Sequence, residues 1–172
     1  QYRQLSKLSL PVVQGPNFDI HRGSNLLMFI LETGSIEFLD VRHGLPEHPV
    51  FDKLHGKTYV AANHFATFPA SAESNLSILT GVYPPRTIYG TCLIDIPRAR
   101  KSLPGPIPLL RAQGYKTAIY APFRSQVPGD KVVFEGTGFE HVVYGDSLSG
   151  PGGADNRTFE RLIDDIKRWA GS

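Results

Sequence analysis

Residues 26 to 31 read Leu-Leu-Met-Phe-Ile-Leu, an uninterrupted apolar run that ends at Glu32. A short run that is apolar at every position is typical of a strand buried on both faces, as in a parallel sheet. The run is much too short to cross a membrane, because a spanning helix needs about 20 apolar residues. We therefore predict a buried strand over residues 25–31 and no membrane span in this chain.

The rest of the chain alternates between strand-like and helix-like patterns, which is typical of βαβ units and a parallel sheet. We predict an α/β fold with a mostly parallel sheet flanked by helices, in which residues 1–24 are an irregular lead-in and 25–172 one domain. Further strands are expected at 57–63, 116–121 and 139–144, and helices at 46–55, from Pro69 to Gly81, at 106–113 and at 156–170.

The last of these helices has the clearest pattern, because its apolar residues recur at helical spacing and define one face. Either Asp155 or Asn156 is expected to cap its start, since both side chains accept hydrogen bonds from the first turn of a helix. The apolar face consists of Phe159, Leu162, Ile163, Ile166 and Trp169.

Charge balance and cysteine content exclude several functional classes. The 172 residues carry 18 basic and 16 acidic side chains, a net charge of +2. The basic residues form no stripe interleaved with aromatic residues, so no nucleic-acid partner is expected. Cys92 is the single cysteine, so the chain forms neither an internal disulfide nor a Cys-rich zinc site.

Glu32 is a candidate functional residue because it directly follows the apolar run. Ligands of parallel sheets bind at the carboxyl ends of the strands. A carboxylate at such an end is costly to bury unless it is paired or binds a cation. The alternative interpretation is a solvated residue at the end of a strand.

Ser71 is a second candidate because it falls at or just before the first turn of the helix expected after Pro69. The backbone N–H groups and the dipole at a helix N-terminus favour an anion, such as an ester phosphate or sulfate. The alternative interpretation is that Ser71 is an ordinary N-cap residue.

Taken together, the segment Leu27–Thr33 and the segment Ser71–Pro84 resemble the alkaline phosphatase superfamily, in its sulfatase and lipoteichoic-acid-synthase-like branches. The sulfatase pattern has its nucleophile ten residues before the Gly of a Ser-Leu-Leu-Thr-Gly stretch, and the other branch has it thirteen before the Pro of a Tyr-Pro pair. Counted back from Gly81 and Pro84, both patterns reach Ser71. Gly114–Thr117 and Gly138–Glu140 resemble two later motifs of the family, so the resemblance covers residues 25 to 145.

The resemblance implies the N-terminal part of an alkaline-phosphatase-like fold and a metal-dependent enzyme that acts on phosphate or sulfate esters. It implies that Ser71 is the nucleophile and that Glu32 and Ser71 are ligands of a divalent metal. Oxygen ligands of this kind suit Mn, Mg or Ca. The substrate would be a small-molecule ester or an ester of a lipid or glycan.

This chain departs from the family pattern at several positions, and these departures limit which site chemistry the resemblance implies. Sulfatases carry Pro or Ala two residues after the nucleophile and Arg four after it, where this chain has Glu73 and Asn75. We therefore expect Ser71 to act as an unmodified serine. The family's Lys and His after the later strand fall on Pro122 and Arg124, and Arg124 is a candidate to bind an ester oxyanion, because a guanidinium matches phosphate geometry.

The sequence contains no counterpart of the Asp-His, usually followed by Gly, that completes the family's metal site. We therefore expect this chain to be the N-terminal part of a sulfatase-like catalytic domain, without the half that carries the other metal ligands. Two alternatives stay open. The chain is a complete but non-catalytic relative that binds a ligand or a partner, or it is an unrelated βαβ nucleotide-binding domain, against which the missing glycine-rich phosphate motif argues.

Overall fold

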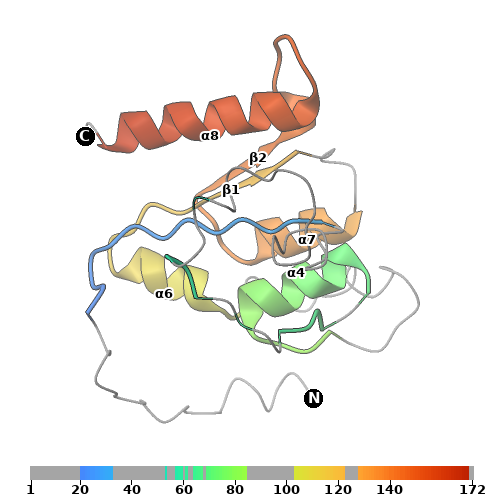
Figure 1. Ribbon diagram of the computed structural model, residues 1–172. Helices are drawn as coiled ribbons and strands as arrows, with labels where there is room; N and C mark the ends of the chain where they lie inside the picture. Colours follow the sequence, from blue (N-terminus) through green and yellow to red (C-terminus); the bar gives the residue numbers. More distant parts are fainter. Residues whose placement is uncertain are drawn as a thin grey trace. The chain divides into compact units, whose positions relative to one another are not determined.

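The structure, a computed structural model, describes residues 20–32, 57–59, 64–67, 69–84, 103–122 and 128–170, together with Lys53 and Ala61. The chain divides into two compact units, residues 1–64 and 65–172. The helices and strands with described bounds lie in the second unit: α4 (Ser71–Thr80), α6 (Pro106–Ala112), β1 (Ala118–Ala121), α7 (Pro128–Gly136), β2 (His141–Tyr144), the 3-10 helix η3 (Gly145–Ser147) and α8 (Ala154–Ala170) (Figure 1).

Strands β1 and β2 pair in parallel, in a register that joins Ala118 to His141 and Ala121 to Tyr144. Helix α7 lies between them in sequence and makes the crossover that a parallel pair requires. The second unit is therefore built around a βαβ motif, and the prediction of an α/β fold with parallel strands is confirmed at this level.

Alternate side chains of β1 separate the two faces of the sheet. On one face, Ala121 and Tyr144 belong to the buried core, against which Ile119 and Val142 pack. On the other face, Tyr120 contacts α8. Figure 1 shows the resulting layers, with α8 on one side of the strands and α4, α6 and α7 on the other. The core between the sheet and the helices contains Leu76, Leu79, Leu103, Ala121, Val133, Phe134 and Tyr144.

Two of the motifs that carry the family resemblance meet at the amino end of this sheet. The Thr117 carbonyl accepts hydrogen bonds from the backbone N–H groups of Glu140 and His141, both at 3.1 Å. The Thr117 hydroxyl also accepts from the Glu140 N–H, at 3.1 Å. Since Thr117 precedes β1 and Glu140 precedes β2, these bonds align the starts of the two strands. Both motifs therefore have a structural role at the end of the sheet opposite to the carboxyl ends of the strands.

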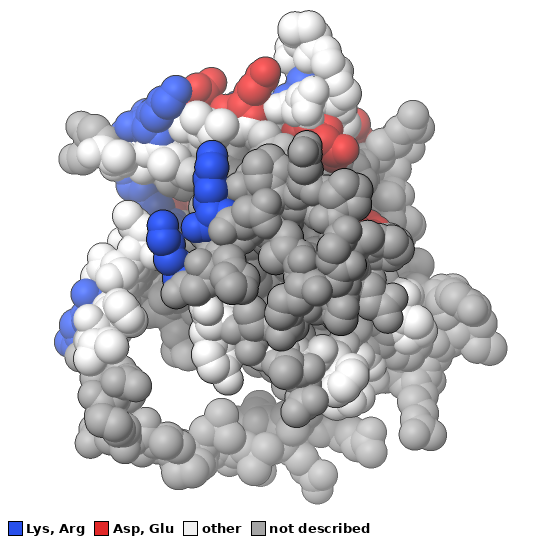
Figure 2. All heavy atoms as spheres, in the orientation of Figure 1, with Lys and Arg blue, Asp and Glu red and all other residues white. Residues whose placement is uncertain are grey.

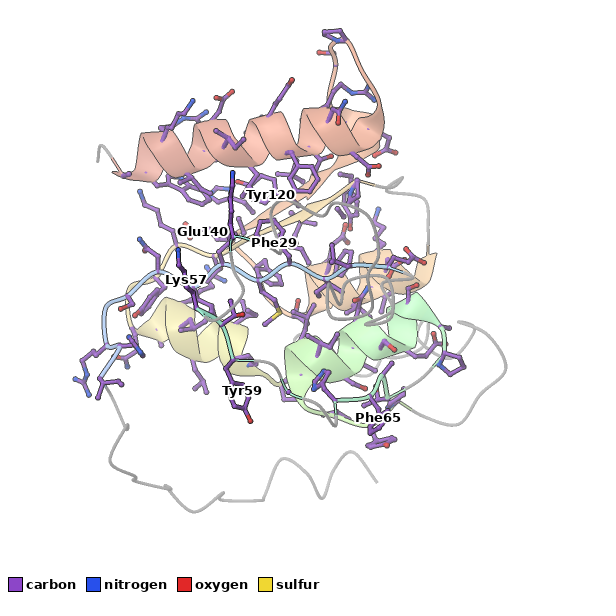
Figure 3. All side chains as sticks on the ribbon, viewed as in Figure 1. Phe29, Lys57, Tyr59, Phe65, Tyr120 and Glu140 are labelled. Atoms are coloured by element: carbon purple, nitrogen blue, oxygen red, sulfur yellow. The ribbon has the colours of Figure 1, made fainter. Side chains whose placement is uncertain are left out.

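A polar cluster centred on Asp165 attaches α8 to β1. The Tyr120 hydroxyl donates to Asp165 Oδ2 at 2.7 Å, and Arg161 Nε donates to the same oxygen at 2.9 Å. Arg168 Nη2 lies 3.1 Å from Oδ1, an ion-pair contact without hydrogen-bond alignment. Figure 3 shows Tyr120 beneath α8. Because Asp165 is 4% exposed, these partners offset the cost of burying its charge.

Helix α8 is amphipathic, as the sequence predicts, but its apolar face is only partly covered. Phe159, Ile163 and Ile166 are 48%, 49% and 41% exposed, whereas the polar residues Thr158 and Asp165 are buried. The reason is that the helix attaches to β1 through the Asp165 cluster, which lies beside the apolar stripe. Figure 2 shows the charges of this helix, with basic residues at its C-terminal end, where they complement the helix dipole.

The predicted helices after Pro69, at 106–113 and at 156–170 are confirmed as α4, α6 and α8, and the predicted strands at 116–121 and 139–144 as β1 and β2. Gly81 ends α4 in the left-handed conformation, as expected. Asp155 and Asn156 lie inside the first turn of α8, because this helix begins at Ala154. Helix α7 was not predicted, because Val132-Val133-Phe134 is typical of a strand.

The predicted strands at 25–31 and 57–63 are wrong where the structure describes them. Residues 24–31 form no helix or strand, and the side chains of 26–31 are 45% to 72% exposed. Lys57, Thr58, Tyr59 and Ala61 are also outside any strand. A strand requires a hydrogen-bonded neighbour, and the sheet of the described residues contains only β1 and β2. Lys53 is helical, and the rest of the helix expected at 46–55 lies outside the described residues, as does Cys92.

No helix in the described ranges combines the length and apolar character that crossing a membrane requires. This finding agrees with the expectation from the sequence.

Tyr144 is the last residue of β2 and is 8% exposed. Among the described residues its hydroxyl has no hydrogen-bond partner. Burial, followed by the negative charges of Glu135, Asp130 and Asp146, raises the pKa of Tyr144 from 10.0 to about 12. The phenol is therefore held in its neutral form.

We expect Asp165→Asn to lower the free energy of unfolding by roughly 2 kcal/mol at pH 7, because hydrogen bonds to a charged group contribute about 1.5–3 kcal/mol. Burial alone would raise the pKa of Asp165, but the bonds from Tyr120 and Arg161 and the charges of Arg161 and Arg168 outweigh it and lower the pKa. The ionised Asp165 carboxylate and its partners therefore stabilise the fold above the ordinary aspartate pKa of about 4. This stabilisation is lost as pH falls further.

Urea unfolding of the unsubstituted chain and of Asp165→Asn between pH 2 and pH 7 measures this difference in the free energy of unfolding. Asp164→Asn is the matched control, because Asp164 is the neighbouring aspartate and is exposed. The difference between Asp165→Asn and the unsubstituted chain should shrink below about pH 4. A difference that is independent of pH, or one no larger than that of Asp164→Asn, would contradict the role assigned to the cluster.

For Tyr144→Phe we expect a free energy of unfolding that is unchanged or higher by up to about 1 kcal/mol at pH 7, because a buried hydroxyl without a partner is removed. In the unfolded chain this phenol ionises near its ordinary pKa of 10.0, whereas in the fold its pKa is about 12. The fold therefore keeps its full stability below pH 10 and loses stability as pH rises toward 12. Tyr144→Phe should therefore lose less stability than the unsubstituted chain over this range. Part of the stability loss at alkaline pH should remain in this variant, because burial also raises the pKa of Tyr120.

Thermal or urea unfolding at pH 7 and at pH 10 to 11.5 gives the comparison, with Tyr83→Phe as the control at a tyrosine that is 76% exposed. A loss of more than about 1 kcal/mol at pH 7 for Tyr144→Phe would mean that the hydroxyl has a stabilising partner.

Candidate functional site

Helix α4 positions the candidate nucleophile. Ala70 is the N-cap residue, with extended backbone angles and no side-chain capping bond, and Ser71 is the first helical residue. The backbone N–H of Ser74 closes the first turn by donating to the Ala70 carbonyl at 3.1 Å. The interpretation of Ser71 as the N-cap is therefore wrong, while its expected place at the helix start is confirmed.

Apolar residues on the buried side of α4 pack into the core and hold the helix in place. Leu76 and Leu79 are 2% and 6% exposed and belong to the core. At the other end, the Gly81 N–H donates to the Ser77 carbonyl at 2.8 Å. Gly105, before α6, packs so closely on the Leu79 carbonyl that a Cβ atom would overlap it. The helix that carries Ser71 is thus fixed along its length, and Ser71 itself is half-buried.

A buried hydrogen bond joins α4 to α7 near the starts of both helices. Asn75 Nδ2 donates to Asp130 Oδ1 at 3.3 Å. Both residues are 7% exposed. Asn75 follows Ser71 by one helical turn on the same side of α4, and Asp130 lies in the first turn of α7. The second turn of α4 therefore lies beside the first turn of α7.

Both strands also end at this side of the unit. Helix α7 follows the carboxyl end of β1, and the backbone of Gly145, just after β2, packs against the Pro122 carbonyl and the Ala154 side chain at the start of α8. Figure 1 shows the starts of α4, α7 and α8 toward the carboxyl ends of the two strands. Helix N-termini concentrate positive potential and are places where anions bind in proteins.

Two buried acidic residues flank the same end. Glu73 is 2% exposed in the first turn of α4, and Asp130 is 7% exposed in the first turn of α7. Sequence reasoning treated Glu73 and Asn75 only as departures from a family pattern and did not single out Asp130 or Tyr144. The signal available for Asp130 was the Pro-Gly-Asp segment at 128–130, since Pro and Asp are both favoured in the first turn of a helix.

The other predicted site residues have different positions. Glu32 lies in the first unit, in an exposed turn that directly follows the apolar run. Arg124 lies outside the described residues. Within the described ranges, no three His, Cys, Asp or Glu side chains gather into a group that would hold a metal ion.

No family model, curated protein or solved structure matches this chain at a significant level.

Proposed function

We propose that this chain belongs to a metal-dependent enzyme that hydrolyses or transfers phosphate or sulfate ester groups, and that Ser71 is its nucleophile. The observation that carries the proposal is the position of Ser71 as the first residue of α4, one turn before the residue that bonds to the first turn of α7. An ester group bound there would meet the N–H groups of a helix start and a serine hydroxyl at the same point.

The residues of this chain would divide the work as follows. The backbone N–H groups of the first turn of α4 would bind the non-bridging oxygens and offset the charge that develops on them. The Ser71 hydroxyl would attack phosphorus or sulfur as the ester oxygen departs, and water or an acceptor alcohol would then take the group. Arg124 is proposed as a further ligand of the ester oxyanion, because a guanidinium matches its geometry.

Glu32 and Ser71 are proposed as ligands of the divalent metal. A carboxylate and a hydroxyl are hard oxygen donors, which suit Mg, Mn or Ca better than softer metals. When bound, such a metal lowers the pKa of a coordinated hydroxyl and polarises an ester oxygen. The finer fold assignment, the N-terminal part of an alkaline-phosphatase-like domain, is proposed on the same residues, and the substrate class is an ester of a small molecule, lipid or glycan.

The test is turnover of an aryl phosphate and an aryl sulfate by this protein with Mn or Mg. Ser71→Ala should lower kcat by at least about a thousandfold, since loss of a nucleophile removes the covalent route. Ser74→Ala is the matched control, because Ser74 lies one turn along the same helix, and it should retain activity within about tenfold.

Turnover that survives Ser71→Ala would contradict the nucleophile assignment. A folded protein with no turnover of either ester, with or without metal, would favour the non-catalytic alternative. Stability of both variants is measured in parallel, so that a lost activity is not confused with unfolding.

A further inference from the structure

We infer that Asn75 and Asp130 are a positioning pair, which holds the first turn of α4, and Ser71 with it, in a fixed register against α7. The inference rests on the proposed function for what the positioning serves, whereas the positioning itself is a property of the two helices. Asp130 is 55 residues from Asn75 in sequence, so the bond is a tertiary contact and not a local turn.

Burial makes this bond hard to replace. Both residues are 7% exposed, and a buried amide or carboxylate without a partner is costly. Any rotation or sliding of α4 that separates Asn75 from Asp130 removes the amide donor from a buried carboxylate. The bond is therefore a constraint on where the start of α4 lies.

The apolar contacts between these helices do not supply the same constraint. Leu76 and Leu79 of α4 share the core with Val133 and Phe134 of α7. Apolar contacts are non-directional, so they hold two helices together without selecting one register. A single buried polar pair does select a register, as a buried polar residue does between paired helices.

Ser71 receives the effect because of helix geometry. Residues four apart lie above one another on the same side of a helix. Ser71 and Asn75 have this spacing, and a rigid turn connects them, closed by the Ser74 N–H bond to the Ala70 carbonyl. The position of the Ser71 hydroxyl relative to α7 is therefore determined by a bond one turn away.

The experiment exchanges the amide and the carboxylate between positions 75 and 130. Asn75→Asp places two carboxylates in contact, and Asn75→Asp combined with Asp130→Asn restores an amide and a carboxylate in the opposite order. The readout is hydrogen exchange of the Ser74 amide, in the first turn of α4, compared with the Gly81 amide at the end of the same helix. Tyr120→Phe, which breaks a partly buried bond on the other face of the sheet, controls for a general loss of stability.

For Asn75→Asp we expect Ser74 exchange to rise by roughly tenfold more than Gly81 exchange, because a hydrogen bond to a charged group is lost. The double variant should return the ratio to within about threefold of the unsubstituted chain, and Tyr120→Phe should leave the ratio unchanged. If Asn75→Asp does not fold, Asp130→Asn is the milder second variant, with an expected rise of about threefold.

Equal acceleration at Ser74 and Gly81 in every variant, or a double variant that restores nothing, would overturn the inference. Because hydrogen exchange requires no substrate and no metal, this failure is distinct from a failure of the proposed enzymatic function. In the activity assay, the double variant should also recover kcat for the aryl ester more than it recovers KM.

Discussion

Four residues of parallel pairing between β1 and β2 set the arrangement of the second unit. A parallel pair requires a crossover, and α7 supplies it. The same pairing directs Ala121 and Tyr144 into the core and Tyr120 toward α8. It also brings the carboxyl ends of both strands to one edge, where α7 and α8 begin. Without this pairing, neither the core nor the Asp165 cluster would have its present partners.

A series of contacts connects the carboxyl ends of the strands to the candidate site. The sheet and the core hold α7, the bond from Asn75 to Asp130 holds α4 against α7, and α4 begins with Ser71. The hydroxyl therefore lies at a helix start on the side where parallel sheets bind ligands. The two family-like motifs at Thr117 and Glu140 lie at the opposite end and align the strands. Part of the sequence resemblance thus reflects how the sheet is built, independently of any chemistry.

Local signals account for what the sequence predicted correctly. Helix α4 has Gly81 at its end and α8 has a strong helical periodicity, and both signals act within a few residues. The predictions that failed depend on distant partners. Residues 26–31 have the composition of a buried strand but no strand neighbour among the described residues. For Val132-Val133-Phe134 no element was predicted; the segment is typical of a strand but forms part of α7, the crossover between β1 and β2. The contact between Asn75 and Asp130 joins residues 55 apart, and no local pattern in the sequence indicates it.

The central claim is that the first turn of α4 binds an ester-type oxyanion beside Ser71. Backbone amide NMR of the chain during titration with inorganic phosphate and with sulfate, at constant ionic strength set by chloride, tests it most directly. The account predicts saturable shifts concentrated at the amides of residues 71–73, which Ser71→Ala preserves in part because the backbone N–H groups remain. Shifts that are absent, or that spread evenly over the basic surface of the chain, would contradict it.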